Sequence, residues 1–192
     1  MSAREGIARG ARGRRPHRVG LVCLDAGEKG AAHLLLDDLA AATDAYECRA
    51  GMGDDAIELL EPHGGAVVDA LVIALGDDGP LCNLPQGAQP GTLVYTVLAC
   101  DAPDAVIPRL EAWCRENGLA WSGALVVEGA WALPATWASP RLGWLRRPVS
   151  EGVDALVLAL RTGSDAGVVR VRQSPARRAW SALLARLFSA RD

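Results

Sequence analysis

The chain is predicted to fold as a three-layer α/β sandwich, in which a parallel sheet carries helices on both faces. Between residues 18 and 127, apolar runs alternate with segments of helical periodicity. The apolar runs lack polar–apolar alternation, which is typical of strands buried on both faces of a parallel sheet. Together with right-handed crossovers, this pattern favours five parallel strands in the order 2-1-3-4-5.

The strands differ in how clearly they are marked. The run 70–75 is continuous and apolar, whereas 45–50 is more polar, which favours a strand at the edge of the sheet. The five expected strands are 19–24, 45–50, 70–75, 92–98 and 123–127.

Helices are expected between these strands. Leu35, Leu39 and Ala42 mark the buried face of the first helix, and Asp54 or Asp55 can cap the second. Gly118 stands where a left-handed residue commonly ends a helix. The expected helices are 31–42, 54–60, 104–117 and 149–160, with loop-rich segments at 76–90 and 131–148.

The two ends of the chain are expected to lie outside the sheet. Residues 1–17 are Arg-rich and lack apolar periodicity, which predicts a disordered tail before a domain over 18–163. Residues 164–192 form an extension, with a basic extended piece at 168–172 and an amphipathic helix over 175–187. The apolar stripe of that helix favours packing on its own domain or on a second copy, so a homodimer is expected; binding to a membrane surface is the alternative.

Charge and cysteine content narrow the classes of function. The net charge is −3, but residues 1–18 and 168–192 each carry six Arg against one acidic residue, a charge of +5 each, which leaves −13 on the residues between. An acidic body repels phosphate backbones, so we expect no nucleic-acid binding through the folded domain. No apolar run is long enough for a transmembrane segment. The five cysteines include no C-x-x-C pair, and without a signal peptide they indicate reduced thiols in the cytoplasm.

Side-chain catalysis is not indicated by any motif. The three histidines are scattered along the chain, and no G-x-S-x-G elbow is present. Four aspartates follow expected strands and are expected to converge at one edge of the sheet. They are either Mg²⁺ ligands or, as we favour, helix caps and turn formers. These aspartates are Asp25, Asp77, Asp78 and Asp101.

Three stretches carry a resemblance to a known family. They are Asn83-Leu84-Pro85, the segment 118–125 with Glu128-Gly129, and Ser174-Pro175-Ala176-Arg177 with Trp180. Over residues 18–190 the chain resembles flavodoxin-like proteins of the NAD(P)H-dependent FMN reductase type. The resemblance implies a flavodoxin-like sandwich that binds FMN and passes hydride from NAD(P)H to a small-molecule acceptor such as a quinone. It implies no catalytic side chain, because the flavin carries the chemistry. The cofactor contacts that it implies are Gly27, Lys29, Gly30, Gly79, Asn83 and Cys100.

The three loops expected at the flavin depart from the family's pattern. The first, 25–30, has no hydroxyl side chain, and Asp25 and Glu28 would repel a phosphate. The second, 76–80, has no aromatic residue, and the third, 99–103, has no glycine. Two functions therefore stay open: an FMN-dependent oxidoreductase, and a flavin-free interaction or scaffold module. Whether the chain is an enzyme is left open with them.

Overall fold

Six parallel strands form a single sheet in the order β2-β1-β3-β4-β5-β6. The computed structural model describes residues 14–25, 30–61, 66–76, 87–172, 174–176, 179–180 and 183. The strands are β1 (Arg18–Cys23), β2 (Glu58–Leu60), β3 (Ala70–Gly76), β4 (Leu93–Ala99), β5 (Ala120–Glu128) and β6 (Val168–Arg172). The helices are α2 (Ala31–Ala50), α3 (Pro103–Glu116), α4 (Leu133–Thr136) and α5 (Arg147–Thr162), with 3-10 turns η1 (Gly53–Asp55) and η2 (Ala130–Ala132).

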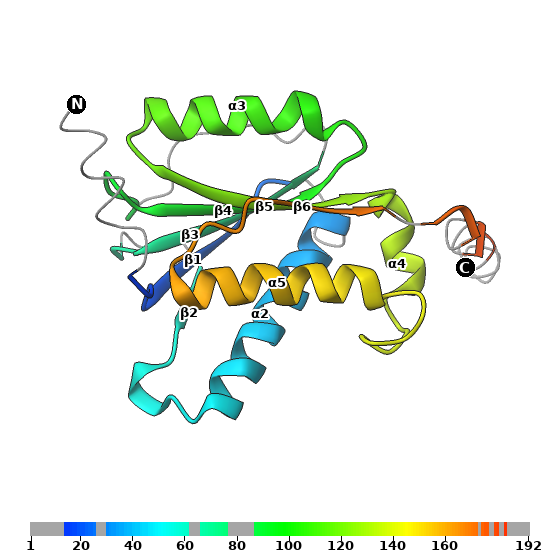
Figure 1. The fold of residues 1–192 in the computed structure, drawn as a ribbon, viewed down its shortest axis with the longest axis horizontal. Coiled ribbons are helices and arrows are strands. Elements are labelled where there is room, and N and C mark those ends of the chain that lie inside the picture. Colours follow the sequence, from blue (N-terminus) through cyan, green and yellow to red (C-terminus); the bar gives the residue numbers. More distant parts are fainter. Residues whose placement is uncertain are drawn as a thin grey trace.

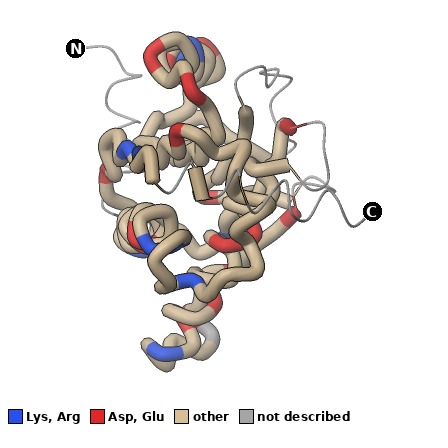
Figure 2. Tube along the Cα trace, turned by 90° about the vertical axis from the view of Figure 1, so that its right-hand side faces the viewer, with Lys and Arg blue, Asp and Glu red and all other residues tan. Residues whose placement is uncertain are grey.

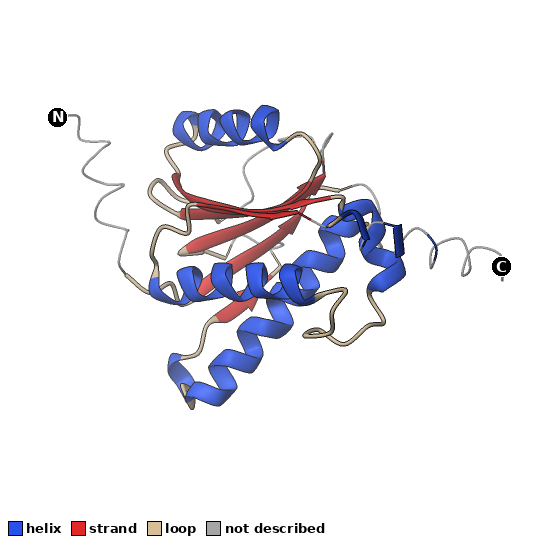
Figure 3. Ribbon diagram, turned by 45° about the vertical axis from the view of Figure 1, so that its right-hand side comes forward, coloured by secondary structure: helices blue, strands red, loops and turns tan. Residues whose placement is uncertain are grey.

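Helices cover both faces of this sheet (Figures 1 and 3). α3 lies on one face, and α2 and α5 lie together on the other. Successive side chains of the central strands alternate between the two cores: Val72 and Tyr95 pack toward α2 and α5, whereas Ile73 and Val94 pack toward α3. The expected α/β fold with a parallel sheet is therefore confirmed. The apolar runs are continuous because the central strands are buried on both faces.

The second strand is not where the sequence pattern placed it. Residues 45–50 continue α2, which runs to Ala50, and the expected helix over 54–60 is instead the turn η1 followed by β2. The helix was not predicted through 45–50 because Glu47, a charged residue, occupies its buried face with only 5% of its surface exposed. Its carboxylate is bonded by Arg15 and by Arg161 at 2.7 Å, partners that local sequence does not reveal.

A sixth strand extends the sheet, so the expectation of five strands is wrong. The basic piece 168–172 pairs in parallel with β5, from Ala124 opposite Val168 to Glu128 opposite Arg172. A bulge in β5 makes room for the turn that leads into β6. Gly123, at this bulge, has a φ of 121°, and a Cβ there would lie 2.4 Å from the carbonyl oxygen of Gly167. The amide of Ala124 donates to that same oxygen at 2.7 Å. The sheet therefore continues into the segment that was expected to be an extension.

The crossover into β6 has the opposite hand to the one before it. Both β4–α3–β5 and β5–α5–β6 step in the same direction across the sheet, yet α3 and α5 lie on opposite faces. The β1–α2–β2 crossover steps the other way on the α5 face, so it shares the hand of β4–α3–β5. Because right-handed crossovers prevail in nearly all parallel sheets, the left-handed one is β5–α5–β6.

Residues 14–17, which the sequence places in a disordered tail, contact the folded body. Arg15 pairs with Glu47, and Pro16 is buried. The backbone amides of His17 and Arg18 both donate to Asp69 Oδ2 at 3.0 Å. Among the described residues, no helix is long and apolar enough to cross a membrane.

A buried ionic network holds the irregular segment between β5 and α5 against the helices. Asp38 of α2 accepts from Arg141 Nε and Arg146 Nη2, each at 3.1 Å, and Arg141 also reaches Asp154 at 2.7 Å. The Arg146 guanidinium stacks on Trp137, 3.8 Å from the ring centroid. Burial lowers the pKa of Arg146, and the facing carboxylate of Asp38 opposes that shift. The segment is therefore anchored even though it has little regular structure.

Candidate functional site

The carboxyl edge of the sheet is the edge at which ligands bind in open α/β folds. The order in which strands are added to the sheet reverses at β1, because β2 pairs with one side of β1 and β3 with the other. The point of reversal therefore lies between β1 and β3. At such a reversal the connections leave in opposite directions and leave a crevice outside the strand ends. The candidate site is therefore built from the ends of β1 and β3 and from the first turn of α2.

Among the described residues, no side chain caps the amino terminus of α2. Gly30 is the N-cap residue, in an extended conformation, and it makes no side-chain capping bond; the first turn has no acidic residue. The first turn of a helix leaves backbone N–H groups without intrahelical partners, and the helix dipole favours an anion beside them. Among the described residues no side chain accepts from those donors, and phosphate sites use helix starts of this kind.

A carboxylate lies on the same edge of the sheet. Asp25 follows β1, and both of its carboxylate oxygens would lie 3.9 Å from a Cβ placed on Gly76, the last residue of β3. The carbonyl oxygen of Ala99 would lie 3.7 Å from the same point. The Asp25 carboxylate therefore lies beside the end of β3, which gives this part of the edge a negative charge.

Farther along the edge, acidic side chains are used to join neighbouring elements. Asp101 Oδ1 accepts from the amide of Gly129 at 2.6 Å, which ties the end of β4 to the end of β5. Arg170 of β6 pairs with Asp104, and Arg172 with Glu128. Sequence reasoning missed these two arginines as neighbours of the edge, because it left 168–172 outside the sheet.

The residues expected to contact a cofactor do not all lie at the carboxyl edge. Gly30 lies at the start of α2, on the carboxyl edge. Cys100 is 2% exposed and packs in the core between the sheet and α3. Gly27, Lys29, Gly79 and Asn83 lie outside the described residues, as do Asp77 and Asp78. The structure therefore brings Gly30 and Asp25 to this edge and places Cys100 in the core beside it.

The thiol of Cys23, near this edge, is held in its neutral form. Burial raises the pKa of Cys23, and the carboxylates of Asp25 and Asp37 raise it further, against a hydrogen bond with the Asp25 backbone that lowers it. A thiol with a raised pKa is a poor nucleophile at neutral pH. Cys23 is therefore a packing residue beside the candidate site and not its nucleophile.

The described part of the chain contains no group of three or more His, Cys, Asp or Glu side chains arranged to hold a metal ion. Asp25 and Asp101 do belong to one edge, but Asp101 is engaged with Gly129. Within this part of the chain, then, the edge offers backbone donors and single carboxylates.

Comparison of the chain with protein-family models, with curated proteins and with solved structures found no match. Its function is therefore argued from the geometry of the carboxyl edge and from the sequence features that accompany it.

Proposed function

We propose that the chain is a flavodoxin-like, NAD(P)H-dependent oxidoreductase that uses FMN and passes electrons to a small-molecule acceptor, possible acceptors including a quinone. One observation carries the proposal. The amino terminus of α2, which no described side chain caps, lies at the carboxyl edge, at the point where the strand order reverses. A phosphate there accepts from backbone N–H groups and benefits from the helix dipole. The arrangement of α2 and α5 on one face and α3 on the other accords with a flavodoxin-like layering.

In this proposal the described residues position the cofactor and do not react. FMN supplies the hydride-transfer chemistry when it is bound. Gly30 and the two residues after it offer the phosphate their amides, and the ring system would lie toward the end of β3 at Gly76. Asp25 opposes phosphate binding by its charge, so the proposal requires the phosphate to lie on the α2 side of the edge.

Titration of FMN fluorescence tests this proposal. The purified protein at tens of micromolar is expected to quench FMN fluorescence to saturation, since micromolar affinity corresponds to about −8 kcal/mol. Ala31→Asp places a carboxylate in the first turn of α2, where it competes with the phosphate for the same N–H groups, and it is expected to weaken binding at least about tenfold. Ala50→Asp, at the other end of α2, is the matched control. A lack of quenching by the wild type, or equal quenching by both variants, contradicts the proposal.

A different observation favours a second function, that of a flavin-free interaction module. Trp131 and Trp144 are 58% and 57% exposed, and Leu142 lies exposed in the same anchored segment. Trp180 and Leu183, from the expected C-terminal stripe, are exposed as well. Large exposed apolar side chains mark protein interaction sites, and aromatic residues dominate their energetics. We propose a second copy of the chain as the partner, which makes the protein a homodimer.

Light scattering at micromolar concentration tests the dimer. Replacing Trp144 and Trp180 with Asp is expected to convert dimers to monomers without unfolding, because both side chains are exposed in the single chain. A monomeric wild type contradicts the dimer. We place the protein in the cytoplasm in this proposal, because the sequence has no C-x-x-C pair or other pattern typical of a disulfide framework. Figure 2 shows acidic and basic positions interspersed among the described residues, which gives no support to nucleic-acid binding through this part of the chain.

A further inference from the structure

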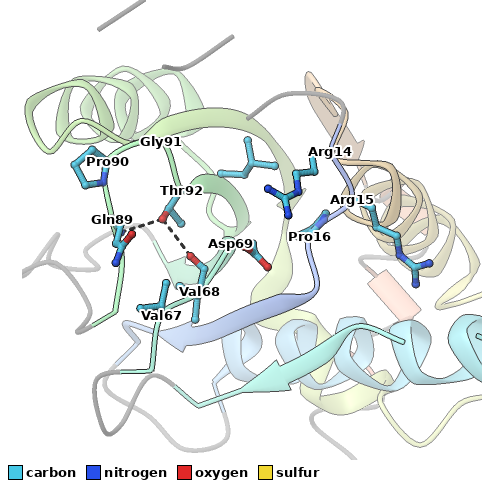
Figure 4. Close-up of a pocket in the computed structure, with 11 residues that line it drawn as sticks. Arg14, Arg15, Pro16, Val67, Val68, Asp69, Gln89, Pro90, Gly91 and Thr92 are labelled. Atoms are coloured by element: carbon cyan, nitrogen blue, oxygen red, sulfur yellow. Dashed lines mark hydrogen bonds between the residues drawn. The ribbon is translucent and has the colours of Figure 1, made fainter. Parts of the chain in front are cut away.

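A cavity lies at the opposite edge of the sheet, where the strands begin (Figure 4). It is an open cavity lined by the arm 14–16, by the residues 67–69 that lead into β3, and by 89–93 at the start of β4, and it measures about 210 Å³. Ligands of open α/β sheets bind at the carboxyl edge, so the fold itself gives no reason for a cavity here. The residues that line it must account for it.

The arm is fixed on both sides of Arg14. Arg15 turns away from the cavity to pair with the buried carboxylate of Glu47. On the other side, His17 and Arg18 donate their amides to Asp69 Oδ2. Gly163 lets the arm pass closely, since a Cβ there would lie 2.1 Å from the carbonyl oxygen of Arg14. These contacts hold the backbone of Arg14 at the rim of the cavity, and Figure 4 shows its side chain pointing inward.

Two opposite charges therefore face the cavity. Among the described residues, nothing pairs with the Arg14 guanidinium, and Asp69 Oδ1 accepts no hydrogen bond, while Asp69 Oδ2 is held by the two amides of the arm. Arg14 and Asp69 do not pair with each other. A rigid carboxylate and an inward-pointing guanidinium offer a ligand one site for a cation and one for an anion.

The remaining walls are apolar or internally satisfied. Val67 is exposed at the cavity, and Pro90 and Leu93 line it as well. The Thr92 hydroxyl donates to the carbonyl of Val68 at 3.3 Å and accepts from the amide of Gln89 at 3.0 Å, so it shapes the wall and is already bonded. A ligand would therefore meet Val67 and Pro90 as apolar contacts beside the two charged groups.

We propose that this cavity binds a small zwitterion with an apolar side chain, of the α-amino-acid type. Arg14 receives the carboxylate, Asp69 Oδ1 receives the ammonium group, and Val67 and Pro90 contact the side chain. The cavity is smaller than the roughly 300–1,000 Å³ of pockets that hold drug-sized ligands, which suits a ligand of amino-acid size. The site is separate from the carboxyl edge, so it does not rest on the binding of FMN.

Ligand-observed NMR with each proteinogenic amino acid in turn, at millimolar concentration, tests the proposal. At least one apolar amino acid is expected to bind with a dissociation constant of about 1 mM or tighter. Calorimetry of that amino acid and of its analogues that lack either the amino or the carboxyl group then separates the two charges. Each analogue is expected to bind about tenfold more weakly or worse.

Two variants assign the charges to residues. Arg14→Gln and Asp69→Asn are each expected to weaken binding about tenfold or more, whereas Arg109→Gln, on the exposed side of α3, leaves it unchanged. Asp69→Asn keeps an oxygen acceptor for the amides of His17 and Arg18; should it nevertheless unfold, Arg14→Gln decides alone, since the Arg14 side chain makes no ion pair in the described structure. The proposal is overturned if no amino acid binds saturably, if the analogues bind as well as their parent, or if Arg14→Gln binds as the wild type does.

Discussion

Replacement of Glu47 by Gln is expected to destabilise the protein by about 3 kcal/mol. Glu47 is buried, and its carboxylate accepts from Arg15, from Arg161 at 2.7 Å and from the amide of Ile57 at 3.2 Å. Removing one partner of a buried ion pair costs roughly 3–5 kcal/mol, because the other charge stays buried without compensation. Both arginines here are partly solvated, and Gln keeps one acceptor, so the lower end of that range applies.

Urea denaturation and thermal melting measure this cost. At roughly 2–4 °C per kcal/mol for a chain of this size, a loss of about 3 kcal/mol lowers Tm by roughly 6–12 °C. Glu58→Gln is the matched control, because Glu58 pairs with Arg18 at the surface and such pairs contribute less than about 1 kcal/mol. Equal, small shifts for the two variants would refute the reasoning, since they would mean that Glu47 is neither buried nor shared by the arm and α5.

Three further outcomes are expected. Gly123→Ala should destabilise the protein by more than Gly53→Ala, and it should speed hydrogen exchange at the Ala124 amide. Both glycines have a positive φ, but of the two only Gly123 would bring a Cβ against backbone atoms. Equal losses of stability would argue against the bulge. Asp38→Asn should cost about 3 kcal/mol in urea denaturation, against little for the exposed Asp37→Asn, because only Asp38 compensates two arginines; similar costs would contradict the network. Burial raises the pKa of Cys114 to about 12, so the folded chain keeps this proton at pH values where the unfolded chain loses it. The free energy of unfolding should therefore fall from about pH 9 toward pH 12, by at most ~1.4 kcal/mol per pH unit. An equally steep fall in Cys114→Ala would assign the effect to other groups.

The central sheet could be predicted from sequence because its strands are long and apolar. β3, β4 and β5 are buried on both faces, and such runs have few alternative structures. The end of α2 could not be predicted in the same way. Its buried position 47 is a glutamate, and the charge is tolerated there because Arg15 and Arg161 reach it from distant parts of the chain.

β6 carried a signal that sequence reasoning left unused. In 168–172, Val171 is buried while the arginines on either side are exposed, which is the alternation of a half-buried edge strand. Its parallel pairing was harder to foresee, because it requires a left-handed crossover after α5. At the candidate site, the bare start of α2 could be read from Gly30-Ala31-Ala32. The approach of Asp25 to Gly76 depends on the pairing of β1 with β3 and appears only in the fold.

Amide NMR locates the site of FMN binding. We expect FMN to shift the amide resonances of residues 30–33 at the start of α2 most strongly, with smaller shifts at Asp25 and Gly76. Residues 67–69 and 89–93, at the opposite edge, are expected to stay unchanged. Shifts of this kind that saturate with FMN would locate the phosphate on the helix terminus. An unchanged spectrum at millimolar FMN, or shifts confined to the opposite edge, would contradict the assignment of the carboxyl edge as a flavin site.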